Sequence, residues 1–325
     1  IEEAIEKDLI SNNRIDMPTG ADVGTINNDD ASISFWINNL ARVAGENVGA
    51  RKLKIALDCA NGAAYKAAPV IFSELLADVT VIHCEPDGIN INDRCGSQHT
   101  EGLAAKVLEI EADIGLAFDG DGDRLIAVDE RGREITGDHI MAICGKRYKE
   151  QGLLTNNLVV ATVMSNFGFF SAMRGLGIEA AASKVGDRYV LETMRRRGAV
   201  LGGEASGHLI FLNHHTTGDG IITALQLLSA MRHYRRPLSG LASIMTLSPQ
   251  KIVNVEVRSK PPIEDIPGLR PAVAEAEAEL KDLGRVLVRY SGTQAMCRVM
   301  VEGPTQEMTD RLAGRLADAV RKGIG

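Results

Sequence analysis

The chain has 325 residues, of which 45% are apolar and 24% are charged, and its formal net charge is −7. This length exceeds one ordinary hydrophobic core and predicts two or three domains, with the composition of a soluble globular protein. The negative charge argues against non-specific binding of nucleic acid. We also expect no membrane insertion, because no apolar run approaches the roughly 20 residues that span a bilayer.

The start of the chain and its cysteines indicate where the protein works. Five cysteines, an odd number with no Cys-x-x-Cys pair, favour a reducing, cytoplasmic environment over a disulfide framework. The chain begins at Ile1 without Met, inside an acidic helical pattern, and has no signal peptide. We therefore expect residues 1–26 to be a helix remnant and linker from a preceding first domain, and a trimmed N-terminus is the alternative.

Helices and strands alternate in the next part of the sequence. The first helix should bury Phe35, Trp36 and Leu40 against the core. We predict helices at 30–44, 63–76 and 100–109, and strands at 53–57, 79–83 and 114–118. Strands that alternate with helices imply a parallel sheet with crossover connections, so 27–133 should form an α/β domain.

A second alternating segment follows and predicts another α/β domain over 134–246. Its predicted helices are 138–150, 167–175 and 217–234, and its predicted strands are 158–162, 199–202 and 208–212. Beyond it we predict strands at 252–257, 286–289 and 297–301 and a helix at 308–319, which make 247–325 a small α+β domain. The predicted fold is therefore α/β, with two consecutive mixed-sheet α/β domains followed by a small α+β C-terminal domain.

The most informative segment is Asp119-Gly-Asp-Gly-Asp-Arg124, called the acidic loop below, which lies between two apolar strand-like runs. The like charges of Asp119, Asp121 and Asp123 repel one another unless a cation neutralises them, and the glycines permit the tight backbone that gathers them. Hard oxygen ligands favour Mg²⁺. An EF-hand is excluded, because its sixth position should be Gly and is Arg124 here. A solvated acidic turn remains the alternative.

A second segment, Arg289-Tyr-Ser-Gly-Thr293, lies between two predicted strands and is followed by Arg298. Ser291 and Thr293 offer hydroxyl groups, and Gly292 lets backbone N–H groups approach an anion. Arg289 and Arg298 add charged donors, so the segment meets the requirements of a phosphate dianion. An ordinary Ser-Gly hairpin with exposed arginines explains it equally well.

Two further segments carry candidate ligand-binding residues. In Gly-Gly-Glu-Ala-Ser-Gly-His, the alternating Glu204, Ser206 and His208 should project to one side and suit sugar hydroxyls and proton transfer. A flexible turn with a surface histidine is the alternative. In Lys-Val-Gly-Asp-Arg-Tyr, Asp187 suits an ammonium group and Arg188 an anion, although the spacing favours Asp187 as a helix N-cap.

Taken together, these segments resemble the α-D-phosphohexomutases over nearly the whole chain and in the same order. The acidic loop resembles the metal loop of that family, 203–208 its sugar-hydroxyl loop, and 289–293 with Arg298 its phosphate loop. The run Val185-Gly-Asp-Arg-Tyr-Val190 is similar to the branch that acts on glucosamine phosphates.

The resemblance implies a four-domain enzyme, of which this chain would hold domains two to four. Such an enzyme isomerises glucosamine 6-phosphate to glucosamine 1-phosphate through a phosphoserine and a bisphosphorylated sugar. The resemblance assigns Mg²⁺ to the three aspartates of the acidic loop, catalytic roles to Arg124 and His208, sugar hydroxyls to Glu204 and Ser206, and the non-reacting phosphate to the phosphate loop. No serine here is followed by His-Asn, the phosphoserine signature, so we expect this chain alone to be inactive.

The phosphate loop departs from the family pattern at Gln294-Ala295, where Glu-Pro is usual, and so loses a charge and a rigid residue. Three other functions remain open. They are a phosphomannomutase/phosphoglucomutase, a non-catalytic sugar-phosphate-binding protein, and a metal-dependent phosphatase with Asp119 as nucleophile. The expected partner is a phosphorylated amino sugar, with no nucleic acid and no membrane, and a homodimer stays open.

Overall fold

The computed structural model describes residues 23–25, 30–44, 52–75, 77–291 and 294–325, and its contacts divide the chain between Trp36 and Ile37. Most of the predicted helix remnant and linker therefore lies outside the described residues. Helix α2 (Asp30–Ala44) has the predicted bounds. Leu40 is buried as predicted, but Phe35 is 69% exposed, so its predicted core position is wrong. Phe35 lies about 100° around the helix from Trp36, which shares a face with Leu40 four residues later.

The first sheet has five strands in the order β2-β1-β3-β4-β5. Its elements are β1 (Leu53–Asp58), α3 (Ala67–Leu75), β2 (Ala77–Ile82), α4 (Glu101–Glu109), β3 (Ile114–Phe118), β4 (Leu125–Asp129) and β5 (Glu134–Ile135). Strand β1 pairs in parallel with β2 and β3, whereas β4 pairs antiparallel with β3 and β5, so the sheet is mixed as predicted. Strand β5, which follows the predicted domain boundary at 133, pairs with β4, so the two domains meet at the edge of this sheet.

The second sheet has the order β7-β6-β8-β9, with three parallel strands and antiparallel β9. Its elements are α5 (Gly137–Glu150), β6 (Leu158–Thr162), α6 (Phe167–Gly175), β7 (Glu179–Ser183), α7 (Asp187–Arg197), β8 (Leu201–Gly203), β9 (Leu209–Phe211), α8 (Gly220–Tyr234) and α9 (Leu238–Ala242). Helix α8 begins at its N-cap Asp219, whose Oδ1 accepts the Ile222 N–H at 2.8 Å. Because Asp219 caps the helix, the helix starts later than the predicted residue 217.

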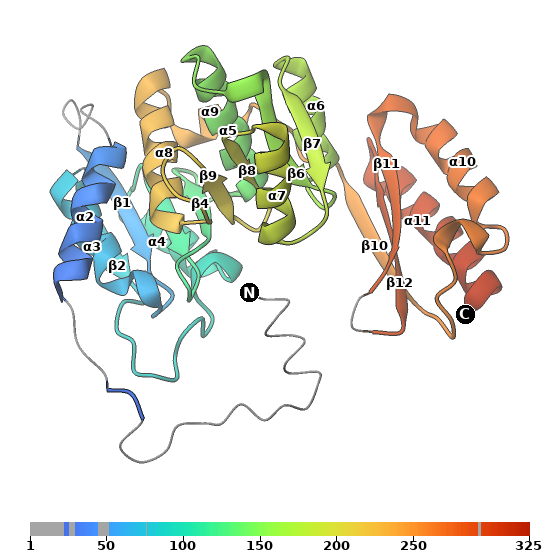
Figure 1. Cartoon of the computed structure of the whole chain (residues 1–325), viewed down its shortest axis with the longest axis horizontal. Coiled ribbons are helices and arrows are strands. Elements are labelled where there is room, and N and C mark those ends of the chain that lie inside the picture. Colours follow the sequence, from blue (N-terminus) through green and yellow to red (C-terminus); the bar gives the residue numbers. More distant parts are fainter. Residues whose placement is uncertain (1–22, 26–29, 45–51, 76, 292–293) are drawn as a thin grey trace. The chain divides into compact units, whose positions relative to one another are not determined.

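The C-terminal domain is an antiparallel sheet in the order β10-β12-β11 with two helices on one face (Figure 1). Its main elements are β10 (Gln250–Glu256), α10 (Leu269–Leu280), β11 (Arg285–Tyr290), β12 (Met296–Glu302) and α11 (Gln306–Ile324). Alternate strand residues such as Val255 and Val299 pack with Leu312 and Leu316 of α11 in one buried cluster. The opposite face of this sheet is therefore available for polar side chains.

A buried polar cluster joins the C-terminal domain to the second α/β domain. The carboxylate of Glu302, which is 0% exposed, accepts the Phe167 N–H at 3.2 Å and Asn166 Nδ2 at 3.0 Å. It also accepts Arg285 Nε, and Arg285 Nη2 donates to the carbonyl of Ser165. These bonds anchor the edge of the C-terminal sheet to the start of α6.

The carboxyl ends of parallel strands bring the predicted segments to two sheet edges. The acidic loop follows β3, beside the loops that follow β1 and β2. Asp187, at the start of α7, and Glu204, in the turn after β8, lie at the corresponding edge of the second sheet. This is where ligands bind in open α/β sheets. Among the described residues, no helix is long and apolar enough to cross a membrane.

Candidate active site

The backbone of the acidic loop folds around Asp119, the residue that follows β3. The Gly122 N–H donates to the Asp119 carbonyl at 3.1 Å, and the Arg124 N–H donates to Asp119 Oδ1, also at 3.1 Å. Gly122 has φ +75°, a backbone conformation that glycine adopts without strain. Asp119 is consequently buried, whereas Asp121 is exposed at the tip of the loop.

The charges of this loop are close together and incompletely satisfied. Burial, and then the neighbouring Asp123, raise the pKa of Asp119 to about 6, although Arg124 opposes the shift. Arg124 Nε lies 3.8 Å from Asp119 Oδ2 and 3.9 Å from Asp123 Oδ1. Among the described residues, Asp123 Oδ1 and Arg124 Nε are buried without a hydrogen-bond partner. An orphaned carboxylate oxygen among three carboxylates fits a hard cation such as Mg²⁺.

The three carboxylates are not drawn together as tightly as ligands around an ion. Three or more His, Cys, Asp or Glu side chains could hold a metal ion where their ligand atoms all lie within 4.8 Å of one another. Among the described residues, the group that meets this criterion is Asp58, His83 and Cys95, and it does not include the aspartates of the acidic loop. Like charges repel, which accounts for the wider spacing of Asp119, Asp121 and Asp123.

Neighbouring loops hold the acidic loop by its backbone. The Ala63 N–H donates to the Gly120 carbonyl at 2.8 Å, and the Gly220 N–H donates to the Gly122 carbonyl at 2.9 Å. A Cβ at position 220 would lie 2.5 Å from the carbonyl oxygen of Arg124, so the start of α8 requires glycine there. The first and second α/β domains thus both support this loop.

His208 contacts the acidic loop directly. Its Nδ1 lies 3.0 Å from Asp123 Oδ2, and its Nε2 accepts the Gly218 N–H at 3.2 Å. Because Nε2 accepts a hydrogen bond, Nδ1 carries the proton that binds the carboxylate. Both ring nitrogens are therefore engaged, and the imidazole is only 4% exposed. These two contacts hold His208 against Asp123, and its proton-transfer role stays a prediction.

Glu204 and Ser206 lie in the hairpin turn between β8 and β9. The Glu204 N–H donates to the His208 carbonyl, and the Gly207 N–H donates to the Glu204 carbonyl, both at 3.0 Å. We predicted that Glu204, Ser206 and His208 project to one side, as alternate residues of a strand do. This is wrong, because the segment is a turn and has no two-residue repeat. Ser206 is exposed, whereas His208 is buried. Ser206 Oγ nevertheless donates to Glu204 Oε2 at 3.4 Å, so the two candidate sugar ligands are adjacent.

The loop that follows β7 meets the same turn. The Gly186 N–H donates to Glu204 Oε1 at 2.9 Å. Asp187 is the first residue of α7 and Gly186 (φ 119°) is its N-cap, so the predicted cap is displaced by one residue. Asp187 and Arg188 are both exposed, and Arg188 Nε pairs with Glu192 Oε1 at 3.3 Å along the helix.

In the C-terminal domain, Arg289 of β11 and Arg298 of β12 stand directly opposite each other. They line a cavity of about 350 Å³ on the sheet face away from the helices, together with Met164, Ile252, Asn254, Leu287 and Met300. Within the described residues, Arg298 Nε is buried with no hydrogen-bond partner. Like charges directly opposite on adjacent strands destabilise a sheet, and a bound anion would offset this cost.

Of the remaining predicted phosphate-loop residues, the structure describes Ser291. Ser291 is buried, and its N–H donates to the Met296 carbonyl at 2.9 Å. Gly292 and Thr293 lie outside the described residues. Met164, which also lines the arginine cavity, follows β6, so this cavity opens beside the carboxyl edge of the second sheet.

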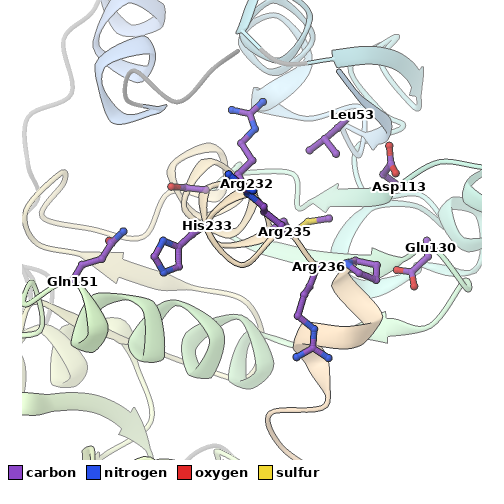
Figure 2. A pocket seen from close by; sticks show the side chains of 11 residues that line it. Leu53, Asp113, Glu130, Gln151, Arg232, His233, Arg235 and Arg236 are labelled. Atoms are coloured by element: carbon purple, nitrogen blue, oxygen red, sulfur yellow. The ribbon is translucent and has the colours of Figure 1, made fainter. Parts of the chain in front are cut away.

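A second cavity, of about 660 Å³, contains none of the predicted residues. Figure 2 shows it at the C-terminal end of α8, where Arg232, Arg235 and Arg236 share it with Asp113 and Glu130. The acidic loop binds the other end of this helix, and fifteen residues rise about 20 Å. This cavity is therefore separate from the candidate active site.

Comparison with protein families identifies the chain. Three family models match it: "Phosphoglucomutase/phosphomannomutase, alpha/beta/alpha domain II" over 34–132, the corresponding domain III over 136–247, and the C-terminal domain over 252–319. The chain belongs to the phosphoglucomutase/phosphomannomutase family. The resemblance to phosphohexomutases inferred from the sequence is thereby confirmed, as is the predicted order of the three domain types.

Individual relatives agree with this family assignment. The chain is 54% identical over 325 residues to a phosphoglucosamine mutase of Syntrophobacter fumaroxidans, covering 100% of the chain and 72% of the relative. It is 51% identical over 326 residues to a phosphoglucosamine mutase of Syntrophus aciditrophicus, again covering 100% of the chain and 72% of the relative.

Solved structures share the fold. A phosphoglucomutase/phosphomannomutase family protein of Burkholderia thailandensis aligns with a TM-score of 0.75 at 20% identity, covering 99% of this chain and 69% of that chain. The N-acetylphosphoglucosamine mutase of Aspergillus fumigatus, solved in complex with GlcNAc-6P and magnesium, gives 0.71 at 20% identity, covering 88% and 69%.

Proposed function

We propose that this chain carries the metal, sugar and phosphate sites of a phosphoglucosamine mutase, which interconverts glucosamine 6-phosphate and glucosamine 1-phosphate. The observation that carries the proposal is the direct bonding of the acidic loop to the candidate sugar loop. His208 binds Asp123, and the Leu125 N–H donates to the Gly207 carbonyl at 3.1 Å. The acidic loop and the candidate sugar loop therefore adjoin each other, which supports a shared site for the phosphoryl group and the sugar. Relatives at 45–54% identity that bear this name support it.

The acidic loop would serve the transferring phosphoryl group. Asp119, Asp121 and Asp123 would hold Mg²⁺, which when bound neutralises charge on that group. Arg124 adds positive charge beside the same position, and we assign His208 to hold Asp123 in place. The half-buried setting of these groups strengthens their interactions relative to bulk water.

The opposite end of the substrate would lie on the C-terminal domain. Arg289 and Arg298 would clamp the non-reacting phosphate, with Ser291, Gly292 and Thr293 as further donors. Binding energy at this remote phosphate orients the sugar and lowers the barrier at the reacting end. Sugar selectivity would come from Glu204 and Ser206 on the hydroxyls and from Asp187 with Arg188, whose loop is bonded to Glu204 through Gly186.

Calorimetric titration of this chain in excess Mg²⁺ tests the proposed substrate. We expect glucosamine 6-phosphate to bind more tightly than mannose 6-phosphate or glucose 6-phosphate. Equal binding of all three, or a preference for mannose or glucose, would favour the phosphomannomutase/phosphoglucomutase alternative. Arg289→Gln and Arg298→Gln should each weaken sugar-phosphate binding at least tenfold, because a charge-assisted pair is lost. Arg258→Gln, at an exposed position of the same domain, is the matched control.

Turnover is a separate question from binding. The chain holds no serine followed by His-Asn, so we propose that it does not catalyse the isomerisation by itself. A coupled assay that detected robust mutase turnover from this chain would contradict the phosphoserine route. We further propose a cytoplasmic location, which the five free cysteines favour. The homodimer stays a prediction that light scattering would test.

A further inference from the structure

Three side chains of metal-ligating type converge where β1 and β2 end, outside the proposed active site. Asp58 is the last residue of β1, His83 follows β2, and Cys95 precedes the helical turn Gly96–Gln98. One ligand atom from each lies within 4.8 Å of the others. Parallel pairing of Asp58 with Ile82 brings the first two together.

Asp58 is fixed in place by a set of donors. Its carboxylate is 0% exposed and accepts the Ala60 N–H at 2.9 Å, the Gly96 N–H at 3.0 Å and His83 Nδ1 at 3.0 Å. Cys95 is 1% exposed. The His83 side chain is 37% exposed, so it forms the solvent side of the cluster. The three ligating groups are therefore held in place before any ion binds.

The same three residue types also make up a nucleophilic Cys-His-Asp site, but the environment of the thiol excludes that role. Burial, and then Asp58 and Asp93, raise the pKa of Cys95 to about 11. A nucleophilic cysteine needs access to its substrate, and Cys95 is only 1% exposed. A bound dication would lower the pKa of the Cys95 thiol, because its positive charge stabilises the thiolate and the Asp58 carboxylate together.

We propose that Asp58, His83 and Cys95 form a second cation site, which takes a thiolate-binding divalent metal of the Zn²⁺ class. One sulfur, one nitrogen and one oxygen ligand are the donor set that Zn²⁺ accepts, and a water molecule would complete four-fold coordination. Mg²⁺ is not expected here, because it requires oxygen ligands. On binding, the Cys95 S–H bond breaks, a sulfur–metal bond forms, and the proton passes to solvent.

A cation bound at this site would stabilise the backbone that supports the acidic loop. The Asn92 N–H donates to the Ala60 carbonyl at 2.9 Å, so the loop before Cys95 is bonded to the loop that follows Asp58. A Cβ at position 96 would lie 2.5 Å from the carbonyl oxygen of Phe118, the residue before Asp119. A cation that cross-links β1, β2 and Cys95 would therefore fix the backbone on which the acidic loop rests.

Titration of this chain with Co²⁺ or Cd²⁺ in saturating Mg²⁺ tests the site. We expect one equivalent to bind, with a thiolate-to-metal charge-transfer absorption and a rise in the melting temperature. Cys95→Ser should abolish the absorption. Cys84→Ser is the matched control and should retain it, since Cys84 is a nearby half-buried thiol that instead donates to the Tyr65 carbonyl at 3.1 Å.

Two further variants make the outcome decisive. His83→Asn should weaken Co²⁺ affinity at least tenfold, and Asn tolerates the positive φ of 48° at this position, so the variant decides the question even if Cys95→Ser fails to fold. Asp121→Asn should keep the absorption, because the acidic loop is a different site. The proposal is overturned if no thiolate absorption appears, if it survives Cys95→Ser, or if Asp121→Asn removes it. None of these outcomes depends on the proposed mutase activity.

Discussion

Replacing Asp138 by Asn is expected to stabilise the chain at neutral pH. Asp138 lies in the first turn of α5, is 1% exposed, and accepts the Asn166 N–H at 2.7 Å through Oδ2. Burial raises the pKa of this carboxyl group from 3.8 to about 6, and the Asn166 N–H only partly opposes the shift. The folded protein therefore contains a carboxylate that would be more stable in the unfolded chain.

The sign and size of the effect follow from proton binding. Between pH 3.8 and about 6 the folded state holds more protons than the unfolded state, so the free energy of unfolding falls as pH rises through this window. A shift of about two units corresponds to an upper limit of roughly 3 kcal/mol. Asn keeps an oxygen for the Asn166 N–H, so we expect Asp138→Asn to gain about 1–2 kcal/mol at pH 7.5 and nothing below pH 3.8.

Urea denaturation followed by circular dichroism from pH 3.5 to 8 measures both quantities. The difference between Asp138→Asn and the unsubstituted chain should grow from pH 4 to pH 6 and then stay constant. Asp282→Asn, at an exposed position, should follow the unsubstituted chain. Parallel pH profiles for Asp138→Asn and the unsubstituted chain, or a loss of stability at pH 7.5, would refute the reasoning.

Three further substitutions test other contacts. Asp121→Asn should weaken Mg²⁺ binding at least tenfold by calorimetry, because a charged oxygen ligand is removed; unchanged affinity would place the cation elsewhere. Gly207→Ala should cost about 2–3 kcal/mol in urea denaturation, because φ is +96° and the new Cβ would collide with the Leu125 carbonyl; an unchanged midpoint would contradict this. Glu302→Gln should cost about 3 kcal/mol, because it leaves the Arg285 guanidinium without its carboxylate. Arg285→Met should cost at least as much, because it leaves the 0% exposed Glu302 carboxylate without its guanidinium, and a smaller loss would contradict this explanation.

Much of the fold follows from local sequence signals. Ile114–Phe118, Leu158–Thr162 and Phe167–Gly175 have the predicted bounds, because apolar runs and helix starts such as Asn166 mark them clearly. Strand β7 was missed since its Glu-Ala-Ala-Ala-Ser sequence has little strand preference and depends on pairing with β6. Helix α10 was missed because alanines supply much of its apolar face.

Some features of the candidate site can be predicted from local sequence, and others depend on tertiary contacts. The composition of the acidic loop alone predicts its carboxylate cluster, since three like charges in five residues need a counter-charge. The contact between His208 and Asp123 spans 85 positions and depends on how two sheets meet, so no local pattern reveals it. The cluster of Asp58, His83 and Cys95 likewise depends on the register of β1 and β2, which local sequence patterns do not specify.

The opposition of Arg289 and Arg298, the proposed phosphate ligands, should weaken the sheet that carries them. Two guanidinium groups on directly paired residues repel, which costs a sheet about 0.5–1 kcal/mol. Arg289→Met should therefore raise the melting temperature of the chain in phosphate-free buffer while it abolishes any rise produced by added inorganic phosphate. The Arg258→Met control should change neither value. If Arg289→Met lowered stability in phosphate-free buffer, the pair would be structural, and the cavity would no longer support an anion site.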